Sequence, residues 1–219
     1  MRVPNSFDVV HCASPVAPLL SGKHRKGHSA LVVTVNDLAW RHFPETTTSR
    51  GRVWHEIALR RALVTADAFV VPSHATAGDL AHAGAPQETS RVIPYGADHL
   101  ASPDVGGTAA LLHRWDIKGE FLLSVGTAEP RKNLGRLLAA YRIARLQLPE
   151  PWPLLLVGPS GARNESLSID PVGVHRLGKV DSGILAGLYA KARLFAYVPL
   201  MEGFGFPPER LCTAERRSL

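Results

Sequence analysis

Short apolar runs alternate with helical patterns along the chain. The runs are rich in β-branched residues, as is typical of strands in the interior of a sheet. They cover residues 8–11, 31–35, 68–72, 91–94, 121–125, 153–157, 174–177 and 194–198. Parallel neighbours cannot be joined by tight hairpins and need crossover helices. The alternation therefore predicts an α/β protein with parallel sheets.

Three segments between these runs have the periodicity of amphipathic helices. Residues 134–144 place their apolar side chains on one face and three arginines away from it. A second helix is predicted over 53–62 and a third over 184–189, the third with Asp181 or Ser182 as its N-cap. The buried face predicted for the second helix consists of Val53, Trp54, Ile57, Ala58 and Ala62.

The pattern lapses between Ala97 and Gly119, where Ser, Pro, Asp and Gly accumulate before a short helical stretch that ends near His113. Such composition is typical of a linker. We therefore predict a partial N-terminal domain over 1–105, a linker over 106–118 and a partial C-terminal domain over 119–219.

Composition excludes several classes of protein. No apolar run approaches the roughly 20 residues of a membrane-spanning helix, and the first residues lack the pattern of a secretory signal. We expect a cytoplasmic protein, with peripheral contact at the inner face of the membrane still open. Cys12 and Cys212 are far apart, and His24 and His28 have no acidic or Cys partner nearby. Neither a disulfide nor a metal site is predicted.

The charge is concentrated in the second half. The net charge is +6; residues 1–110 hold ten Lys/Arg and nine Asp/Glu, whereas 111–219 hold fifteen and ten. No aromatic-basic interleaving or nucleic-acid motif accompanies this excess. An anionic small molecule such as a nucleotide diphosphate accounts for it better than nucleic acid does, and solvated arginines account for part of it.

The first motif follows the run 121–125. Gly126 would let a phosphate approach the backbone at the carboxyl end of a strand, where parallel sheets bind ligands. Arg131 and Lys132 then precede a helix that begins near Asn133, and helix N-termini favour anions. An ordinary basic turn is the alternative interpretation of this segment.

The second motif follows the last apolar run. Gly203 and Gly205 flank Phe204, so the backbone can wrap around a ligand while Glu202 offers acceptors to sugar hydroxyls. Taken alone, this segment is also compatible with an ordinary loop.

Together the motifs resemble glycosyltransferase family 4 in order and spacing, over about residues 8–209. The matching segments are VTVNDL (33–38), FVVPS (69–73), VIPYGAD (92–98), VGTAEPRKNL (125–134), LVGPSG (156–161), LGKV (177–180), LYAKA (188–192) and EGFGFP (202–207). The resemblance implies a GT-B fold of two Rossmann-like parallel-sheet domains. It implies transfer of a hexosyl unit, such as mannosyl, from a nucleotide diphosphate sugar to a glycan or glycolipid acceptor, with retention.

The resemblance also assigns roles to residues. Arg131 and Lys132 would bind the donor diphosphate and stabilise the leaving group, with Gly126 and Thr127 beside them. The main chain around Val180 would meet the base of GDP or UDP. Further residues are implied to contact the sugars: Glu202, Gly203, Phe204 and Gly205 the transferred sugar, and Asn36 and Asp37 the acceptor side. Neither a cofactor nor a metal is implied.

The sequence departs from the family pattern at three places. Asn36 stands where the family has a histidine, so a group that titrates near neutral pH is replaced by an amide. The family's second glutamate corresponds to Arg210, with Glu209 one position early. We expect both domains to be incomplete, because the family has a strand and a Gly-rich loop before the segment that matches residues 8–11, and because residues 209–219 lack the family's apolar helix pattern.

Two other functions remain open. The first is a catalytically inactive fragment that at most binds nucleotide. The second is a dinucleotide-dependent oxidoreductase, which is disfavoured because the chain has no G-x-G-x-x-G after a strand.

Overall fold

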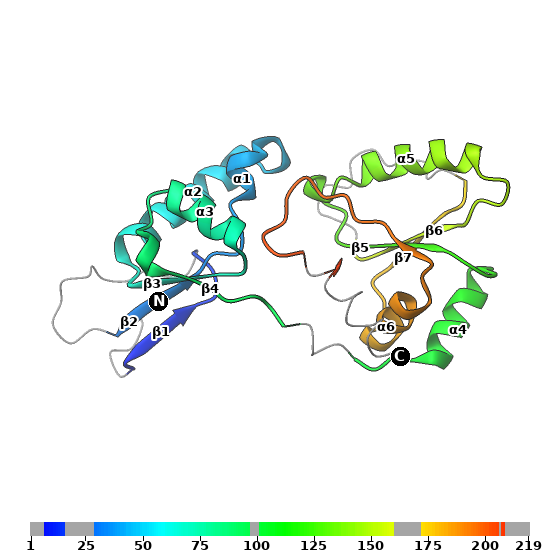
Figure 1. Ribbon diagram of the computed structural model, residues 1–219, viewed down its shortest axis with the longest axis horizontal. Coiled ribbons are helices and arrows are strands. Elements are labelled where there is room, and N and C mark those ends of the chain that lie inside the picture. The colour runs from blue at the N-terminus through cyan, green and yellow to red at the C-terminus, as the bar shows by residue number, and fades with distance from the viewer. Residues whose placement is uncertain (1–6, 16–28, 97–100, 160–171, 206, 209–219) are drawn as a thin grey trace. The chain divides into compact units, whose positions relative to one another are not determined.

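The computed structural model describes residues 7–15, 29–96, 101–159, 172–205 and 207–208. The chain forms two compact units (Figure 1). The first comprises Met1–Tyr95 together with Glu202–Phe204, and the second Gly96–Met201 together with Gly205–Leu219. The boundary therefore lies near residue 95 and not at the predicted 105.

The first unit contains a parallel sheet in the order β1-β2-β3-β4. The strands are β1 (Val9–Cys12), β2 (Ala30–Thr34), β3 (Ala68–Val71) and β4 (Ser90–Val92). Each lies within two residues of a predicted run, so the α/β prediction is confirmed here. The helical elements are α1 (Ala39–His42), α2 (Ser49–Thr65), α3 (His74–His82) and the 3-10 turns Pro44–Thr46 and Gln87–Thr89.

The buried face predicted for α2 is correct for Ala62 and wrong for three of its other residues. Leu59 and Ala62 are fully buried and Ala66 follows them into the same core, where they meet Phe69 of β3. Val53, Trp54 and Ile57 are exposed instead. The helix begins at Ser49, capped by the Thr48 side chain, and carries apolar residues on two faces. Periodicity cannot tell which of two apolar faces meets the sheet.

A bidentate ion pair joins α1 to α2. Arg41 donates to Glu56 through Nε at 3.0 Å and Nη2 at 2.7 Å. The hydrogen bond from Arg41 is the main cause that lowers the pKa of Glu56, with Arg60 adding to it against the effect of burial. Because the pKa of Glu56 is lower in the folded than in the unfolded chain, its ionised carboxylate stabilises the fold at pH values above the ordinary pKa. This contribution is lost as the pH falls through the pKa of the folded state.

Glu56→Gln should therefore destabilise the first unit at neutral pH by about 0.5–1 kcal/mol. The difference from wild type should disappear as the pH falls below the ordinary value of 4.5. Urea unfolding across a pH series measures it, with Glu45→Gln on the neighbouring 3-10 turn as control. Equal curves for wild type and Glu56→Gln at pH 7 would contradict the assignment.

The second unit has a parallel sheet in the order β7-β6-β5-β8. Its strands are β5 (Leu122–Val125), β6 (Leu154–Val157), β7 (Val174–Gly178) and β8 (Leu194–Phe195). The run predicted over 194–198 is shorter here, because only Leu194 and Phe195 pair with β5. The helices are α4 (Val105–Arg114), α5 (Leu134–Gln147) and α6 (Ser182–Lys191), with a 3-10 turn at Pro130–Lys132.

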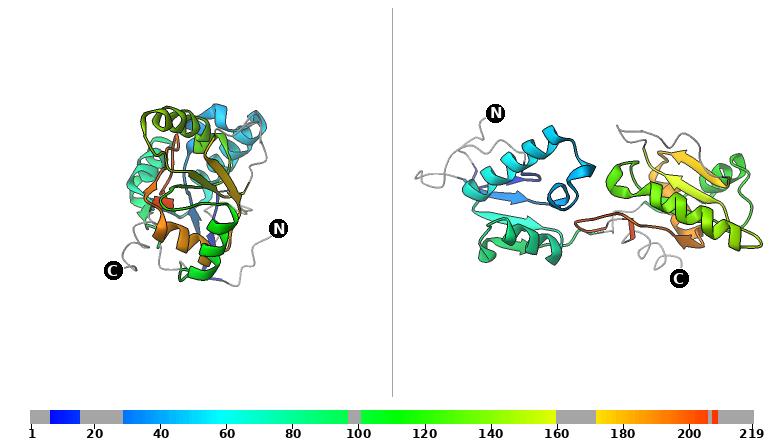
Figure 2. Two further views of the ribbon diagram at one scale, coloured as in Figure 1. Left: turned by 90° about the vertical axis from the view of Figure 1, so that its right-hand side faces the viewer. Right: turned by 90° about the horizontal axis from the view of Figure 1, so that it is seen from above.

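Helices cover both faces of this sheet (Figures 1 and 2). On one face Leu154 and Leu156 of β6 pack with α5. On the other face Leu155 and Val157 pack in a core that includes Leu188 of α6. All four residues of β6 are buried, as expected for a strand between two helical layers.

The linker predicted over 106–118 is wrong, because most of it is α4. Asp104 accepts a hydrogen bond from the Gly107 amide at 2.8 Å and caps the helix. Thr108 is fully buried where α4 meets α6. A Cβ at Gly187 would lie 2.1 Å from Thr108 Oγ1, so the two helices are packed closely. The two glycines of Val105–Gly107 resemble a linker in the sequence but form the first turn of a helix.

The strand order of the second unit reverses at β5. The chain proceeds from β5 to β6 to β7 and then returns to place β8 on the other side of β5. The switch point of the sheet therefore lies between β5 and β8. Open α/β sheets bind ligands at such a point.

Candidate functional site

A pocket of about 160 Å³ lies at the carboxyl end of this sheet. It is lined by residues of β5, β6 and β7, by the loops that follow them, and by Tyr197 and Val198 beyond β8. Gly126 and Lys132, two of the predicted site residues, line it. The structure thus places a cation and a glycine of the first motif at a pocket over the carboxyl ends of β5, β6 and β7.

Two glycines bring the loops after β5 and β6 into contact. Gly158 has φ of +141°, and a Cβ there would lie 2.1 Å from the carbonyl oxygen of Gly126. The Gly126 amide donates to Val157 at 2.9 Å, and the Gly158 amide donates to Gly178 at 2.9 Å. These ladder bonds continue past the strand ends and fix the floor of the pocket.

Lys132 is held over this floor. Its side-chain carbons lie 3.6 to 3.8 Å from the position of a Cβ at Gly126, an ordinary van der Waals distance. Its Nζ lies 5.8 Å from the centre of the Tyr197 ring, within the range of a cation–π contact. The aliphatic part of the side chain therefore packs on protein while its charge lies at the pocket.

Arg131 points elsewhere. Its Nη1 donates to the carbonyl oxygen of Met201 at 3.1 Å, and its own carbonyl accepts from the Leu200 amide at 2.9 Å. The next residue but one, Asn133, has a left-handed conformation and donates through Nδ2 to Val198 at 3.0 Å. Arg131 is not among the residues that line the pocket. Its contacts join the turn before α5 to the segment after β8.

Arg176 of β7 is a pocket residue that the sequence analysis missed. It pairs in register with Leu156, which faces α5, so the two side chains share that face of the sheet. Both line the pocket. The sequence could have indicated this residue, because Arg176 is a basic residue within an apolar strand and lies two positions before the carboxyl end of that strand. With Lys132 it gives the pocket two cationic groups.

The other predicted residues of this unit lie at its edge. Thr127 accepts a hydrogen bond from the Glu129 amide at 2.8 Å, and neither residue is among those that line the pocket. The Val180 side chain packs against the core between the sheet and α6. Gly205 has φ of +88°. The nucleotide and sugar contacts predicted for these residues stay predictions.

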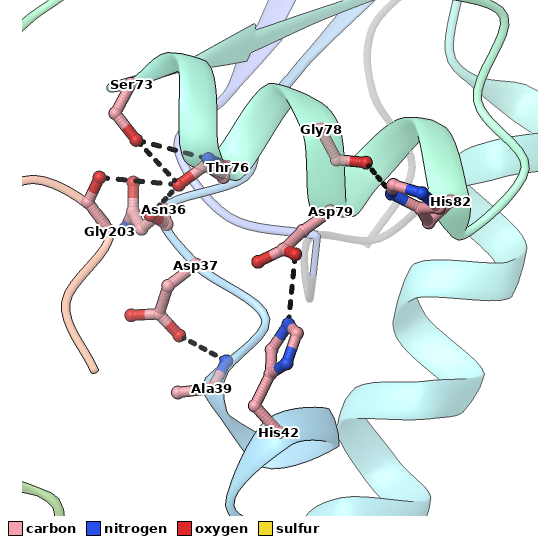
Figure 3. Close-up of polar contacts among 10 residues, drawn as sticks. All are labelled: Asn36, Asp37, Ala39, His42, Ser73, Thr76, Gly78, Asp79, His82 and Gly203. Carbon is pink, nitrogen blue, oxygen red and sulfur yellow. Dashed lines mark hydrogen bonds and ion pairs between the residues drawn. The ribbon is translucent and has the colours of Figure 1, made fainter. Parts of the chain in front are cut away.

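In the first unit, Asn36 and Asp37 follow the carboxyl end of β2. Asp37 Oδ1 accepts a hydrogen bond at 3.0 Å from the amide of Ala39, the first residue of α1 (Figure 3). The Tyr95 hydroxyl donates to Asn36 Oδ1. Burial raises the pKa of Tyr95, and the Asp37 carboxylate raises it further, so the hydroxyl keeps its proton.

The segment Glu202–Phe204 belongs to this same unit. A Cβ at Gly203 would overlap the carbonyl oxygen of Asn36, at 1.8 Å. The buried Thr76 hydroxyl lies 3.3 Å from that oxygen and 3.4 Å from the Gly203 oxygen (Figure 3). Phe204 meets Tyr95 edge to face with ring centres 5.4 Å apart. The second motif thus packs on the acceptor-side residues predicted from the sequence.

Some predicted features lie outside the described residues. They are His24, His28, Asp98, residues 160–161, Glu209, Arg210 and Cys212. Within the described ranges, no three His, Cys, Asp or Glu side chains gather as metal ligands do. Over the same ranges, no helix has the length and apolar character that crossing a bilayer requires.

Comparisons with known proteins agree with the fold and the motifs. Residues 3–99 match the model of a family described as Glycosyltransferase Family 4. The chain is 30% identical over 129 residues to the serotype-specific mannosyltransferase WbdA of Escherichia coli, covering 55% of the chain and 15% of WbdA. It is 37% identical over 93 residues to O-antigen chain mannosyltransferase B of Escherichia coli, covering 40% of the chain and 24% of that protein.

Solved structures show the same architecture. The crystal structure of Anabaena Alr3699/HepE with UDP aligns at a TM-score of 0.67 and 19% identity, covering 95% of the chain and 58% of that structure. At this identity the likeness concerns the fold, which is of the GT-B type with Rossmann-like units. The chain spans well under a third of the length of the mannosyltransferases and 58% of the structural relative.

Proposed function

We propose that this chain, which resembles glycosyltransferase family 4 in its motifs and matches the model of that family over residues 3–99, transfers a hexosyl unit from a nucleotide diphosphate sugar to a glycan or glycolipid acceptor. The observation that carries the proposal is the pocket at the carboxyl ends of β5, β6 and β7 with its two cations, Lys132 and Arg176. A diphosphate is the ligand whose charge such a pocket complements.

The chemistry follows from where negative charge develops. When the bond between the sugar and the diphosphate breaks, charge accumulates on the departing nucleotide. Cations fixed beforehand stabilise this charge without rearranging. Lys132 supplies one of them, and its packing on Gly126 and Tyr197 keeps it in place. The proposal includes no metal or cofactor.

Three further assignments complete the proposal. Arg131 contacts the diphosphate beside Lys132, its neighbour in the turn before α5. Glu202 and the amides of Gly203–Gly205 contact the transferred sugar, and the main chain near Val180 contacts the base. The reaction proceeds with retention, and Asn36 and Asp37 border the acceptor.

Mannose is the first sugar to test, because two relatives are named mannosyltransferases. UDP is the second nucleotide to test beside GDP, because a structural relative was solved with UDP. Calorimetric titration with GDP and UDP tests the site, and release of nucleotide from GDP-mannose and UDP-glucose with an acceptor glycan tests transfer. Binding without turnover would favour the inactive, nucleotide-binding alternative. Absence of both would overturn the proposal.

Restoring Asn36 to histidine should raise transfer by about tenfold or more, the lower range of acid–base effects. The imidazole titrates near neutral pH, whereas the amide does not. Tyr95 already donates to this side chain and would orient the ring. Initial rates of wild type, Asn36→His and the amide control Asn36→Gln decide the matter. A folded Asn36→His variant with an unchanged or lower rate would count against a chemical role at this position.

A further inference from the structure

The hydroxyl of Thr76 connects two segments that lie far apart in the sequence. Thr76 is in the first turn of α3 and is 1% exposed. Its Oγ1 lies 3.3 Å from the carbonyl oxygen of Asn36, 40 residues away, and 3.4 Å from that of Gly203, 127 residues away (Figure 3). Both distances are long for a hydroxyl donor, as expected when one proton is shared by two acceptors.

This use of a threonine in a helix is unusual. The hydroxyl of a helical threonine ordinarily bonds a carbonyl of the preceding turn of its own helix. Thr65 and Thr108 do so, each with the carbonyl four residues earlier. Thr76 instead accepts from the Ser73 hydroxyl at 3.2 Å, and its own proton is directed to the two distant carbonyls.

A donor at this place stabilises a close approach of two backbone segments. Gly203 is buried, and its backbone passes so near Asn36 that a Cβ at Gly203 would overlap the Asn36 carbonyl oxygen. Two carbonyl oxygens in such proximity repel each other, and a buried one without a donor costs free energy. The Thr76 hydroxyl offsets both effects.

The two segments carry the residues that the proposed function assigns to the sugars. Asn36 and Asp37 border the acceptor in that proposal, and the segment Glu202–Phe204 contacts the transferred sugar. Tyr95 also meets both segments, since its hydroxyl donates to Asn36 and its ring packs edge to face on Phe204. The contacts of Thr76 and Tyr95 therefore set the distance between the acceptor-side residues and Glu202.

We propose that Thr76 is a positioning residue for sugar transfer, whose hydroxyl holds the segment Glu202–Phe204 against Asn36. The inference rests on the proposed function, because the groups that Thr76 positions are the ones assigned to the sugars. Thr76 fixes the backbone from which Glu202 extends and contacts neither substrate. Misplacing reacting groups by about 1 Å lowers rates by up to about 100-fold.

Thr76→Val replaces the hydroxyl with a methyl group of similar size. It should lower kcat by about 10- to 100-fold with GDP-mannose or UDP-glucose as donor. Binding of GDP or UDP alone should be unchanged, because Lys132 and Arg176 line a pocket of the other unit. Thr76→Ser keeps the hydroxyl and should restore most of the rate. Thr108→Val, which removes a buried hydroxyl where α4 meets α6, is the matched control and should leave kcat unchanged.

A second measurement requires no substrate. The chain has seven phenylalanines, and labelling with 4-fluorophenylalanine, with Phe204→Leu as reference, identifies the fluorine resonance of Phe204. Contact with the Tyr95 ring influences its chemical shift. The resonance should move in Thr76→Val and keep its position in Thr76→Ser and Thr108→Val. Thermal melts check folding, and Thr76→Ala replaces the valine variant if that one does not melt cooperatively.

The two measurements separate this inference from the proposed function. An unmoved Phe204 resonance in folded Thr76→Val would show that the hydroxyl does not hold the segment. A moved resonance with wild-type kcat would show that this contact has no part in transfer, and an equal loss of kcat in Thr76→Ser would mean that the side chain acts through packing. Each of these results overturns the inference while the proposed function stands. Absence of turnover in wild type overturns the proposed function, and the role of Thr76 in transfer with it.

Discussion

Gly158→Ala is expected to destabilise the second unit by about 3–5 kcal/mol, at the upper end of single substitutions. Gly158 has φ of +141°, which an L-residue with a side chain adopts only under strain. An added Cβ would lie 2.1 Å from the Gly126 carbonyl oxygen and 2.7 Å from its carbon. Both atoms are backbone, so no side chain can rotate away to make room.

The surrounding hydrogen bonds prevent an easy adjustment. Gly126 is tied to Val157 and Gly158 to Gly178, each at 2.9 Å. Moving either glycine breaks bonds at the carboxyl ends of β5, β6 or β7 and distorts the floor of the pocket. The variant should therefore lose nucleotide binding as well as stability.

Gly135→Ala is the matched control, since a Cβ at Gly135 meets nothing within 4 Å. It lies in the first turn of α5, where alanine should be neutral or stabilising by up to about 1 kcal/mol. Urea unfolding of the three proteins gives the comparison. Equal midpoints for Gly158→Ala and Gly135→Ala would show that the contact between the two loops is not as tight as the structure has it.

Lys132→Ala should weaken binding of a nucleoside diphosphate by about 10- to 150-fold, since a charge-assisted contact is worth about 1.5–3 kcal/mol. Lys132 lies at the pocket with its stem packed on Gly126 and its charge over Tyr197. Arg176→Gln should weaken binding over a similar range, because it removes the second cation of the same pocket.

The comparison of ligands makes this prediction sharper. Calorimetric titration with UDP, UMP and uridine should show the largest loss for UDP and almost none for uridine, since only the phosphates carry charge. Lys191→Ala, an exposed cation at the end of α6, serves as the control and should bind as wild type does. Uniform losses for all three ligands would mean that Lys132 shapes the loop and does not contact phosphate.

The sequence by itself determined the fold class and the edge of the sheet at which the candidate pocket lies. Buried strands of a parallel sheet are continuous apolar runs, so β5 and β6 could be located to within one residue. Loops at their carboxyl ends are short, so Gly126 and Lys132 had to lie at that edge of the sheet. The family resemblance drew on the same local segments, because motifs of this kind are contiguous in sequence.

Only the tertiary structure decided which way side chains point and what covers them. Helix α2 has two apolar faces, and the sheet selected Leu59 and Ala62 while Val53 and Trp54 stayed outside. The Arg131 side chain donates to Met201, which lies 70 residues away in the sequence. Arg176 of β7 and Lys132 of the turn after β5 line the same pocket. These contacts depend on strand order and on the packing of distant segments. Local sequence periodicity shows which residues share a face of a helix or strand. It does not show which distant segment packs against that face.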